Sequence, residues 1–160
     1  MKNKIKNLEI KLKFKIKDAS LFAKAFTHKS ANRENNNEKL EFLGDRVLGL
    51  ILSKKLFDLY PHESEGDLDK RFAKLVNRET CSKIAWSIGL QDSIFLGDMK
   101  YKVTSKDGKI LSDLCEAFIG AIYIDQGYQN CEKIVLDLWE KYLKKSNVTI
   151  LDSKTNNSAS

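Results

Sequence analysis

Apolar residues recur three or four positions apart along most of this chain, which is the spacing that one face of an α-helix requires. The longest such run begins after Asn37 and continues to about Tyr60, where Pro61 ends it. Carboxylates interrupt its first two turns, so the predicted helix has an apolar face and an acidic face. Its apolar positions are Leu40, Leu43, Val47, Leu48, Ile51 and Leu52.

Residues 3–17 fit two patterns. Lysines alternate with apolar residues over 10–16, which is typical of a strand, whereas Leu8 and Leu12 follow helical spacing. The rest of the sequence offers no partner strand, so we expect a helix that ends near Leu12. Asp18 is then placed to cap a short helix.

Caps and glycines divide the remaining chain. A capping box at residues 64–67 begins one helix, and Asn77 begins the next. Residues 90–108 are mixed and predict a short helix with a loop. The helix over 109–125 is apolar on nearly all sides, so we expect it to be buried. Gly127 separates it from a last helix, and the predicted fold class is all-α.

Composition indicates one domain with a real core, because the 160 residues are 42% hydrophobic and 31% charged. We expect this domain to span residues 1–146, with residues 147–160 as a flexible tail or linker. The net charge is +6. Residues 1–33 hold ten basic and two acidic residues, a net charge of +8, so the net charge of the rest of the chain is near −2. A basic arm beside an acidic centre suits a polyanionic partner, and a merely solubilising surface is an equal alternative.

The three cysteines are far apart and the two histidines are not grouped with them, so spacing predicts neither a zinc site nor a disulfide framework. Reduced, buried thiols are the expected state. No apolar run approaches the length of a membrane span or a signal peptide. We therefore expect a cytoplasmic protein without a membrane partner.

Acidic residues line one face of the helix after Asn37. Glu38, Glu41 and Asp45 fall at i, i+3 and i+7. Three like charges in a row repel each other, so this face is favourable when a cation lies against it. A solvated acidic surface is the alternative.

A second acidic pair, Asp113 and Glu116, lies on one face of the apolar helix, where burial disfavours a charged carboxylate. No basic residue occurs between Lys109 and Lys133, so we expect no local side chain to supply the opposite charge. A cation shared between the two acidic helices would supply this positive charge. The alternative is that Asp113 and Glu116 lie at the rim of the helix and bond to a lysine that is distant in the sequence. Oxygen ligands select a hard ion such as Mg²⁺ or Mn²⁺. The predicted ligands are Glu41, Asp45, Asp113 and Glu116.

Such a metal site is suited to hydrolysis at phosphorus, and a basic chain indicates a nucleic acid as the substrate. The same residues resemble a known family. The stretch Asn37–Asp45 is similar to the hallmark motif of the ribonuclease III family, and residues 27–30, 65–67 and 113–123 match that family in order and spacing. The resemblance covers about residues 5–145.

The resemblance implies an all-helical endonuclease domain that works as a homodimer on double-stranded RNA, including precursors of rRNA and mRNA. It implies Mg²⁺ as the metal, with Mn²⁺ as a substitute, no small-molecule cofactor, and products with 5′-phosphate and 3′-hydroxyl ends. It assigns the catalytic role to Asp45 and Glu116 and the dimer contact to Phe42. Accessory acids near the substrate or the second catalytic centre are Glu38 and Glu65.

Two features depart from the family pattern. Arg46 follows the motif where a small residue is common, and we expect no effect on the metal. Bacterial members usually continue into a double-stranded-RNA-binding domain. Residues 151–155 resemble its start, and the rest of that domain is not in this sequence.

Two other functions compete with the nuclease. A non-catalytic relative could bind structured RNA within a ribonucleoprotein, but such a relative would be free to lose its carboxylates, and here all are present. A helical interaction module with incidental acids is the other alternative, and the unexplained charge of Asp113 and Glu116 argues against it.

Overall fold

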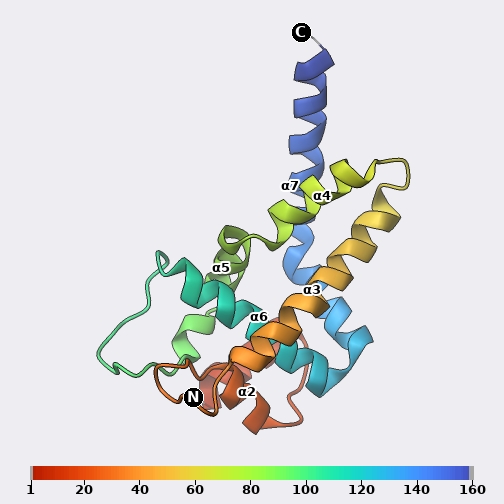
Figure 1. Ribbon diagram of the computed structural model, residues 1–160. Coiled ribbons are helices and arrows are strands. Elements are labelled where there is room, and N and C mark those ends of the chain that lie inside the picture. Colours follow the sequence, from red (N-terminus) through yellow and green to blue (C-terminus); the bar gives the residue numbers. More distant parts are fainter. Residues whose placement is uncertain (1, 159–160) are drawn as a thin grey trace.

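The computed structural model describes the backbone of residues 2–158 and the side chains of residues 3–145, and this part is all-α as predicted (Figure 1). Its helices are α1 (Lys2–Leu12), α2 (Ala19–Ala25), α3 (Glu38–Leu59), α4 (Glu65–Val76), α5 (Arg78–Ser87), a 3-10 helix η1 (Leu90–Ser93), α6 (Gly108–Gln126) and α7 (Tyr128–Ser158). Within the described residues, extended backbone pairs only at one isolated bridge, between Thr27 and Phe95.

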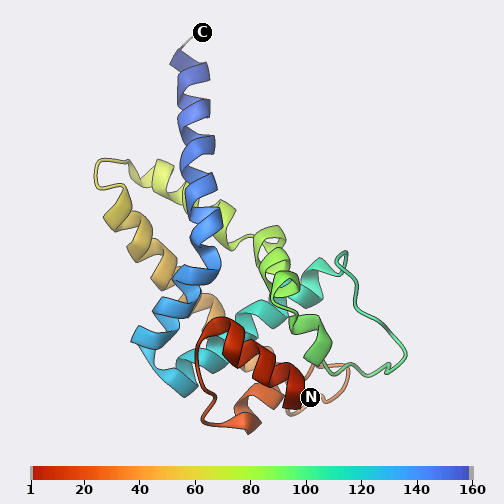
Figure 2. The same cartoon turned by 180° about the vertical axis from the view of Figure 1, so that it is seen from behind.

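Helix α6 forms the centre of the core, as its apolar sequence predicts. It packs against α3, α5, α2 and α7, and Leu111, Leu114 and Phe118 are among its fully buried residues. The Phe118 ring contacts Phe22 and Phe26 from the α2 region. Helices α1 and α7 lie on the side opposite α3, which Figure 2 shows from behind. The site described below therefore sits on the most deeply buried helix of the molecule.

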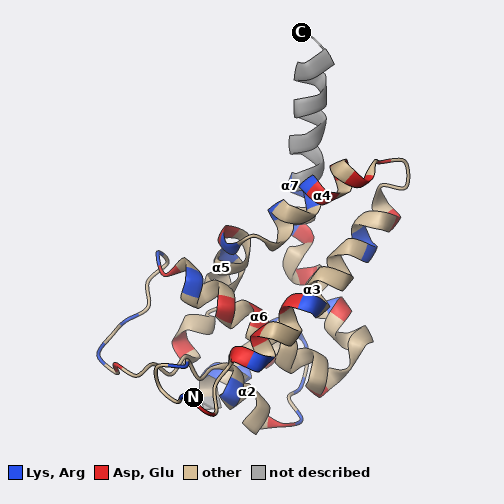
Figure 3. Ribbon diagram, viewed as in Figure 1, with Lys and Arg blue, Asp and Glu red and all other residues tan. Residues whose placement is uncertain are grey.

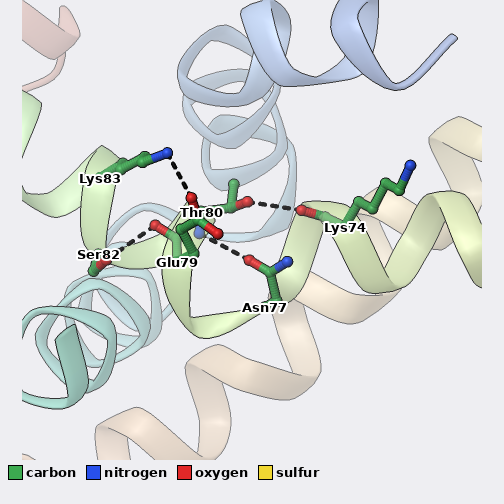
Figure 4. Close-up of polar contacts among 6 residues, drawn as sticks. All are labelled: Lys74, Asn77, Glu79, Thr80, Ser82 and Lys83. Atoms are coloured by element: carbon green, nitrogen blue, oxygen red, sulfur yellow. Dashed lines mark hydrogen bonds and ion pairs between the residues drawn. The ribbon is translucent and has the colours of Figure 1, made fainter. Parts of the chain in front are cut away.

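Capping side chains set the helix ends where the sequence predicts them. Asp18 accepts a hydrogen bond from the backbone N–H of Ser20 at the start of α2, and Ser64 accepts one from the N–H of Asp67 at the start of α4. At the junction of α4 and α5, Asn77 accepts a hydrogen bond from the N–H of Thr80 (Figure 4). Each cap satisfies a backbone donor that the first turn of a helix leaves unpaired.

The ambiguous N-terminal segment is helical, and α1 ends at Leu12 as expected. Helix α7 continues past Ser146 to Ser158, so its end comes later than the polar sequence indicates. The division of the chain into a domain of residues 1–146 and a tail of 147–160 stays a prediction, because the side chains beyond residue 145 lie outside the described part.

The indole N–H of Trp139 donates a hydrogen bond of 2.8 Å to the carbonyl oxygen of Leu75, which joins α7 to α4 inside the core. The three cysteines are buried free thiols, as expected. Among the described residues, no helix is both long enough and apolar enough to cross a membrane.

Candidate functional site

Helices α3 and α6 touch through their backbones at two glycines. A Cβ atom at Gly44 would lie 1.7 Å from the carbonyl oxygen of Glu116, and one at Gly120 would lie 2.2 Å from the carbonyl oxygen of Leu40. Only residues without a side chain permit this approach. The close crossing places Glu41 and Asp45, which flank Gly44, beside the turn of α6 that carries Glu116.

The four predicted metal ligands are brought together at this crossing. Figure 3 shows acidic segments on the first half of α3 and on the neighbouring part of α6. Burial raises the pKa of Glu116 to about 8, and the negative charges of Asp45, Glu41 and Asp113 add to the shift. Burial likewise raises the pKa of Glu41 to about 7, followed by the charge of Asp113 and a hydrogen bond with its side chain. The charges of Asp45, Glu41 and Asp113 thus act on Glu116, and ionising all four acids together would give the cluster an excess of negative charge.

Two of the four acids are paired with cations, and this corrects one sequence-based expectation. Lys109 lies one turn before Asp113, with its Nζ 3.1 Å from Asp113 Oδ2, so a local side chain does supply positive charge. Lys109 and Asp113 form an i, i+4 pair on α6, so the expectation that no local side chain neutralises Asp113 is wrong. The Lys109 side chain is 64% exposed, so it lies at the rim of the cluster and Glu116 has no such partner among the described residues.

Asp45 has the second ion pair. Its Oδ2 accepts a hydrogen bond of 3.0 Å from Nη1 of Arg46, the next residue along α3. In the described part of the chain, no three acidic, histidine or cysteine side chains are gathered around one point that would hold an ion. The donor types and the surplus negative charge fit a divalent cation, and binding one requires both acids to exchange partners.

The loop before α3 brings His28 to the edge of the cluster. Burial lowers the pKa of His28, as does Lys29, while the charges of Asp113 and Glu38 act against this shift. The backbone N–H of Ser30 donates to His28 Nδ1 at 3.1 Å, so the neutral ring carries its proton on Nε2. The backbone N–H of His28 donates to the carbonyl oxygen of Phe95, which ties this loop to the segment after η1. His28 is therefore a fixed side chain beside the acids.

The two accessory acids lie in different places. Glu38 is exposed in the first turn of α3, close enough to Glu41 for its charge to raise the Glu41 pKa. Glu65 is exposed in the first turn of α4, beyond the far end of α3 (Figure 1). Because α3 is 22 residues long, its ends lie about 33 Å apart. Within one chain Glu65 is thus separate from the cluster, and only a second copy could bring it near one.

Phe42 points away from the core, and its side chain is 61% exposed. Two more large apolar residues on α3, Leu50 and Phe57, are 59% and 67% exposed. We call Phe42, Leu50 and Phe57 the α3 stripe. Positions 42, 50 and 57 fall on one face of α3 by helical spacing, and their exposure shows that this face is not covered by the described part of the chain. Exposed apolar residues aligned along one helix indicate a surface for another protein.

Fold and site together define an all-α domain with an acidic centre where α3 crosses the buried helix α6. A family model described as Ribonuclease-III-like matches residues 18–143. The chain is 50% identical to Ribonuclease 3 of Pelagibacter ubique over 97% of its own length and 70% of that protein. It is 42% identical to Ribonuclease 3 of Rhodopseudomonas palustris, over 92% of this chain and 56% of that protein.

Solved structures of ribonuclease III nuclease domains and of a Dicer have folds similar to that of this chain. The nuclease domain of ribonuclease III from Campylobacter jejuni, studied for flexibility in a region involved in dimer formation, superposes with a TM-score of 0.81 at 41% identity, over 88% of this chain and 99% of that one. Dicer from Pichia stipitis gives a TM-score of 0.65 at 29% identity, over 84% of this chain and 60% of that one. The chain belongs to the ribonuclease III family, and its fold is that of the family's nuclease domain.

Proposed function

We propose that this chain is a Mg²⁺-dependent endoribonuclease that cleaves double-stranded RNA as a homodimer and leaves 5′-phosphate and 3′-hydroxyl ends. Its nuclease class follows from the family. The observation that supports the metal is the convergence of four carboxylates from α3 and α6, where burial, and after it the charge of neighbouring carboxylates, raises the pKa of Glu41 to about 7 and of Glu116 to about 8. Surplus negative charge of this kind is what a divalent cation neutralises.

Glu41, Asp45, Asp113 and Glu116 would hold the metal, which when bound would activate water and stabilise charge at phosphorus. Mn²⁺, which prefers the same oxygen ligands, would substitute. Lys109 and His28 at the rim present an ammonium and an imidazole N–H to the space where an RNA phosphate would lie.

The charge distribution and the α3 stripe support the RNA and the dimer. Exposed lysines before α2, at positions 13, 15 and 17, suit a phosphate backbone, and recognition of duplex RNA rests on shape and 2′-hydroxyl contacts. Phe42 needs an apolar socket that its own chain does not supply, and a second copy would offer one. A dimer would also explain Glu65, whose distance from its own cluster leaves the partner's cluster as its place of action.

The test is to incubate long duplex RNA with the protein, with and without Mg²⁺, and to size and end-label the products. We expect Mg²⁺-dependent fragments with 5′-phosphates, and no fragments from Glu116→Gln. This variant should still bind duplex RNA in Ca²⁺. Glu140→Gln, an exposed acid on α7, is the matched control and should cut at the normal rate. Normal cutting by Glu116→Gln would rule out the assigned role.

One observation favours a second candidate, a non-catalytic relative that binds structured RNA. Asp45 and Asp113 are paired with Arg46 and Lys109, and although the four acids are neighbours, no three potential ligands in the described part surround one point as a bound metal would require. Under this alternative the wild-type protein retards duplex RNA in a gel, yet Mg²⁺ produces no fragments and no heat of binding in calorimetry.

A further inference from the structure

Arg46 contacts two residues to which the proposed function gives different tasks. Its Nη1 donates a hydrogen bond of 3.0 Å to Asp45 Oδ2, and its guanidinium carbon lies 4.0 Å from the centre of the Phe42 ring. Asp45 belongs to the four-carboxylate cluster, whereas Phe42 belongs to the α3 stripe. A single side chain therefore touches both the acidic centre and the exposed apolar surface.

The contact with Asp45 works against metal binding. One oxygen of Asp45 is occupied by the guanidinium, and a fixed positive charge beside the cluster repels an incoming cation. Arginine stays charged at every pH the protein meets, so this competition is permanent. Both side chains are more than half exposed, at 61% for Arg46 and 52% for Asp45, so the pair is weak enough for a metal to displace.

The contact with Phe42 works in favour of an interface. A guanidinium stacks flat on an aromatic ring and is weakly hydrated, so it covers one face of the ring without holding much water there. Arginine and aromatic residues are also the types that carry most binding energy at interfaces. Arg46 lies one turn from Phe42 and one turn from Leu50, so it extends the α3 stripe without a gap.

We propose that Arg46 is a positioning residue that couples the α3 stripe to the metal site: it backs the Phe42 ring for a second copy of this chain, and it holds Asp45 until a divalent cation replaces it. This inference rests on the proposed function. It predicts effects of opposite sign, because removal of Arg46 should tighten metal binding and weaken the dimer. A residue that only supported the fold would weaken both.

The test measures Mg²⁺ binding by calorimetry and the monomer–dimer equilibrium by sedimentation, on the whole chain. Arg46→Ala should bind Mg²⁺ about threefold more tightly, the size expected for loss of an exposed ion pair, and its dimer should dissociate about tenfold more readily. Arg46→Met keeps an apolar stem on the ring and should show only the tighter metal binding. Arg46→Lys keeps the charge without the flat face and should show only the weaker dimer.

Lys83→Ala is the matched control, because Lys83 also lies in an exposed ion pair, with Glu79, but on α5 rather than on the α3 stripe, and this variant should leave both properties unchanged. Metal binding is compared at protein concentrations where every variant is dimeric. Absence of Mg²⁺ binding by the wild-type protein, or unchanged binding by Glu116→Gln, overturns the proposed function. If the wild type binds Mg²⁺ normally but Arg46→Ala binds it equally or more weakly, the role of Arg46 alone is overturned. An unchanged dimer in Arg46→Ala also overturns that role alone.

Discussion

Gly44 of α3 rests directly on the carbonyl oxygen of Glu116 of α6, where even a methyl group would lie 1.7 Å from that oxygen. The contact is between backbones, so no rotation of a side chain can relieve it. Gly120 makes the reciprocal approach to Leu40, and the two glycines fix how close the helices come. The position of the carboxylates thus depends on residues that have no side chain of their own.

Gly44→Ala should therefore destabilise the fold by at least about 1–3 kcal/mol, because α3 and α6 must move apart to admit the methyl group. The same movement should separate the carboxylates and weaken Mg²⁺ binding. Urea unfolding and calorimetry measure the two effects. Gly49→Ala is the control on the same helix, since its Cβ would meet only the Phe72 ring at 3.6 Å. Alanine favours a helix by about 1 kcal/mol over glycine, so this control should be neutral or stabilising.

The raised pKa values of Glu41 and Glu116 predict how stability changes with pH when no divalent metal is present. Both pKa values lie above the usual 4.5, at about 7 and about 8, so between about pH 4.5 and 8 these two carboxyl groups bind more protons in the folded chain than in the unfolded chain, while His28, whose pKa burial lowers, acts in the opposite sense. Stability should then fall as pH rises through this window. Urea unfolding at pH 5.5 and pH 8 in EDTA tests the sign.

Glu116→Gln should remove much of that pH dependence, because its side chain stays neutral in both states. Glu140→Gln, whose acid is exposed on α7, should keep the wild-type dependence. A wild-type protein that gains stability from pH 5.5 to pH 8 would contradict the assignment of a repulsive carboxylate cluster.

Added Mg²⁺ should oppose the loss of stability that we expect as the pH rises. A metal binds the ionised carboxylates, so binding at neutral pH must release protons from Glu41 and Glu116, and affinity should rise from pH 6 to pH 8. The increase in Tm on adding Mg²⁺ should accordingly be larger at pH 8 than at pH 6. A calorimetric titration in two buffers of different ionisation heat counts the protons released. No proton release at pH 7 would argue against metal binding at this cluster.

The sequence predicted the helices well because local signals decide their ends. Asp18, Ser64 and Asn77 cap the helices they were expected to cap, and Gly127 ends α6 with φ of 82°. It also predicted that acids from two helices converge, since their spacing and the apolar residues around them leave few other arrangements.

The ion pairs of the site were not predicted, because they depend on side-chain choices that spacing does not settle. Lys109 is one turn from Asp113 and pairs with it, and Arg46 pairs with its neighbour Asp45. The expectation that Arg46 has no effect on the metal stays a prediction. The close crossing could not be predicted from Gly44 and Gly120, because the close contact of a helical glycine depends on a second helix whose position the sequence does not give. The roles of the site residues remain predictions.

Phe42→Ala should weaken the dimer while leaving the monomer fold intact, because the ring is 61% exposed and contributes little to its own core. Sedimentation across a dilution series measures the change, and aromatic anchors at an interface are typically worth at least about 2 kcal/mol, or roughly thirtyfold in dissociation. Trp86→Ala is the control, as an exposed aromatic residue on α5 rather than on α3. An unchanged dimer in Phe42→Ala would exclude the α3 stripe as the interface.

The turn between α3 and α4, which carries Glu65 to its exposed position, is held by a buried ion pair. Arg71 is 1% exposed, its Nη2 lies 2.6 Å from Glu63 Oε1, and its guanidinium stacks 3.8 Å from the centre of the Tyr60 ring. Arg71→Ala leaves a mostly buried carboxylate without this partner, which typically costs about 3–5 kcal/mol. Lys83→Ala, which breaks an exposed pair with Glu79, should leave the free energy of unfolding nearly unchanged. Urea unfolding compares the two, and equal losses would mean that the turn is fixed by other contacts.

Cleavage by folded Arg71→Ala at low temperature then tests whether placing Glu65 matters for catalysis: a Glu65→Gln variant should show the same loss of cleavage without the loss of stability.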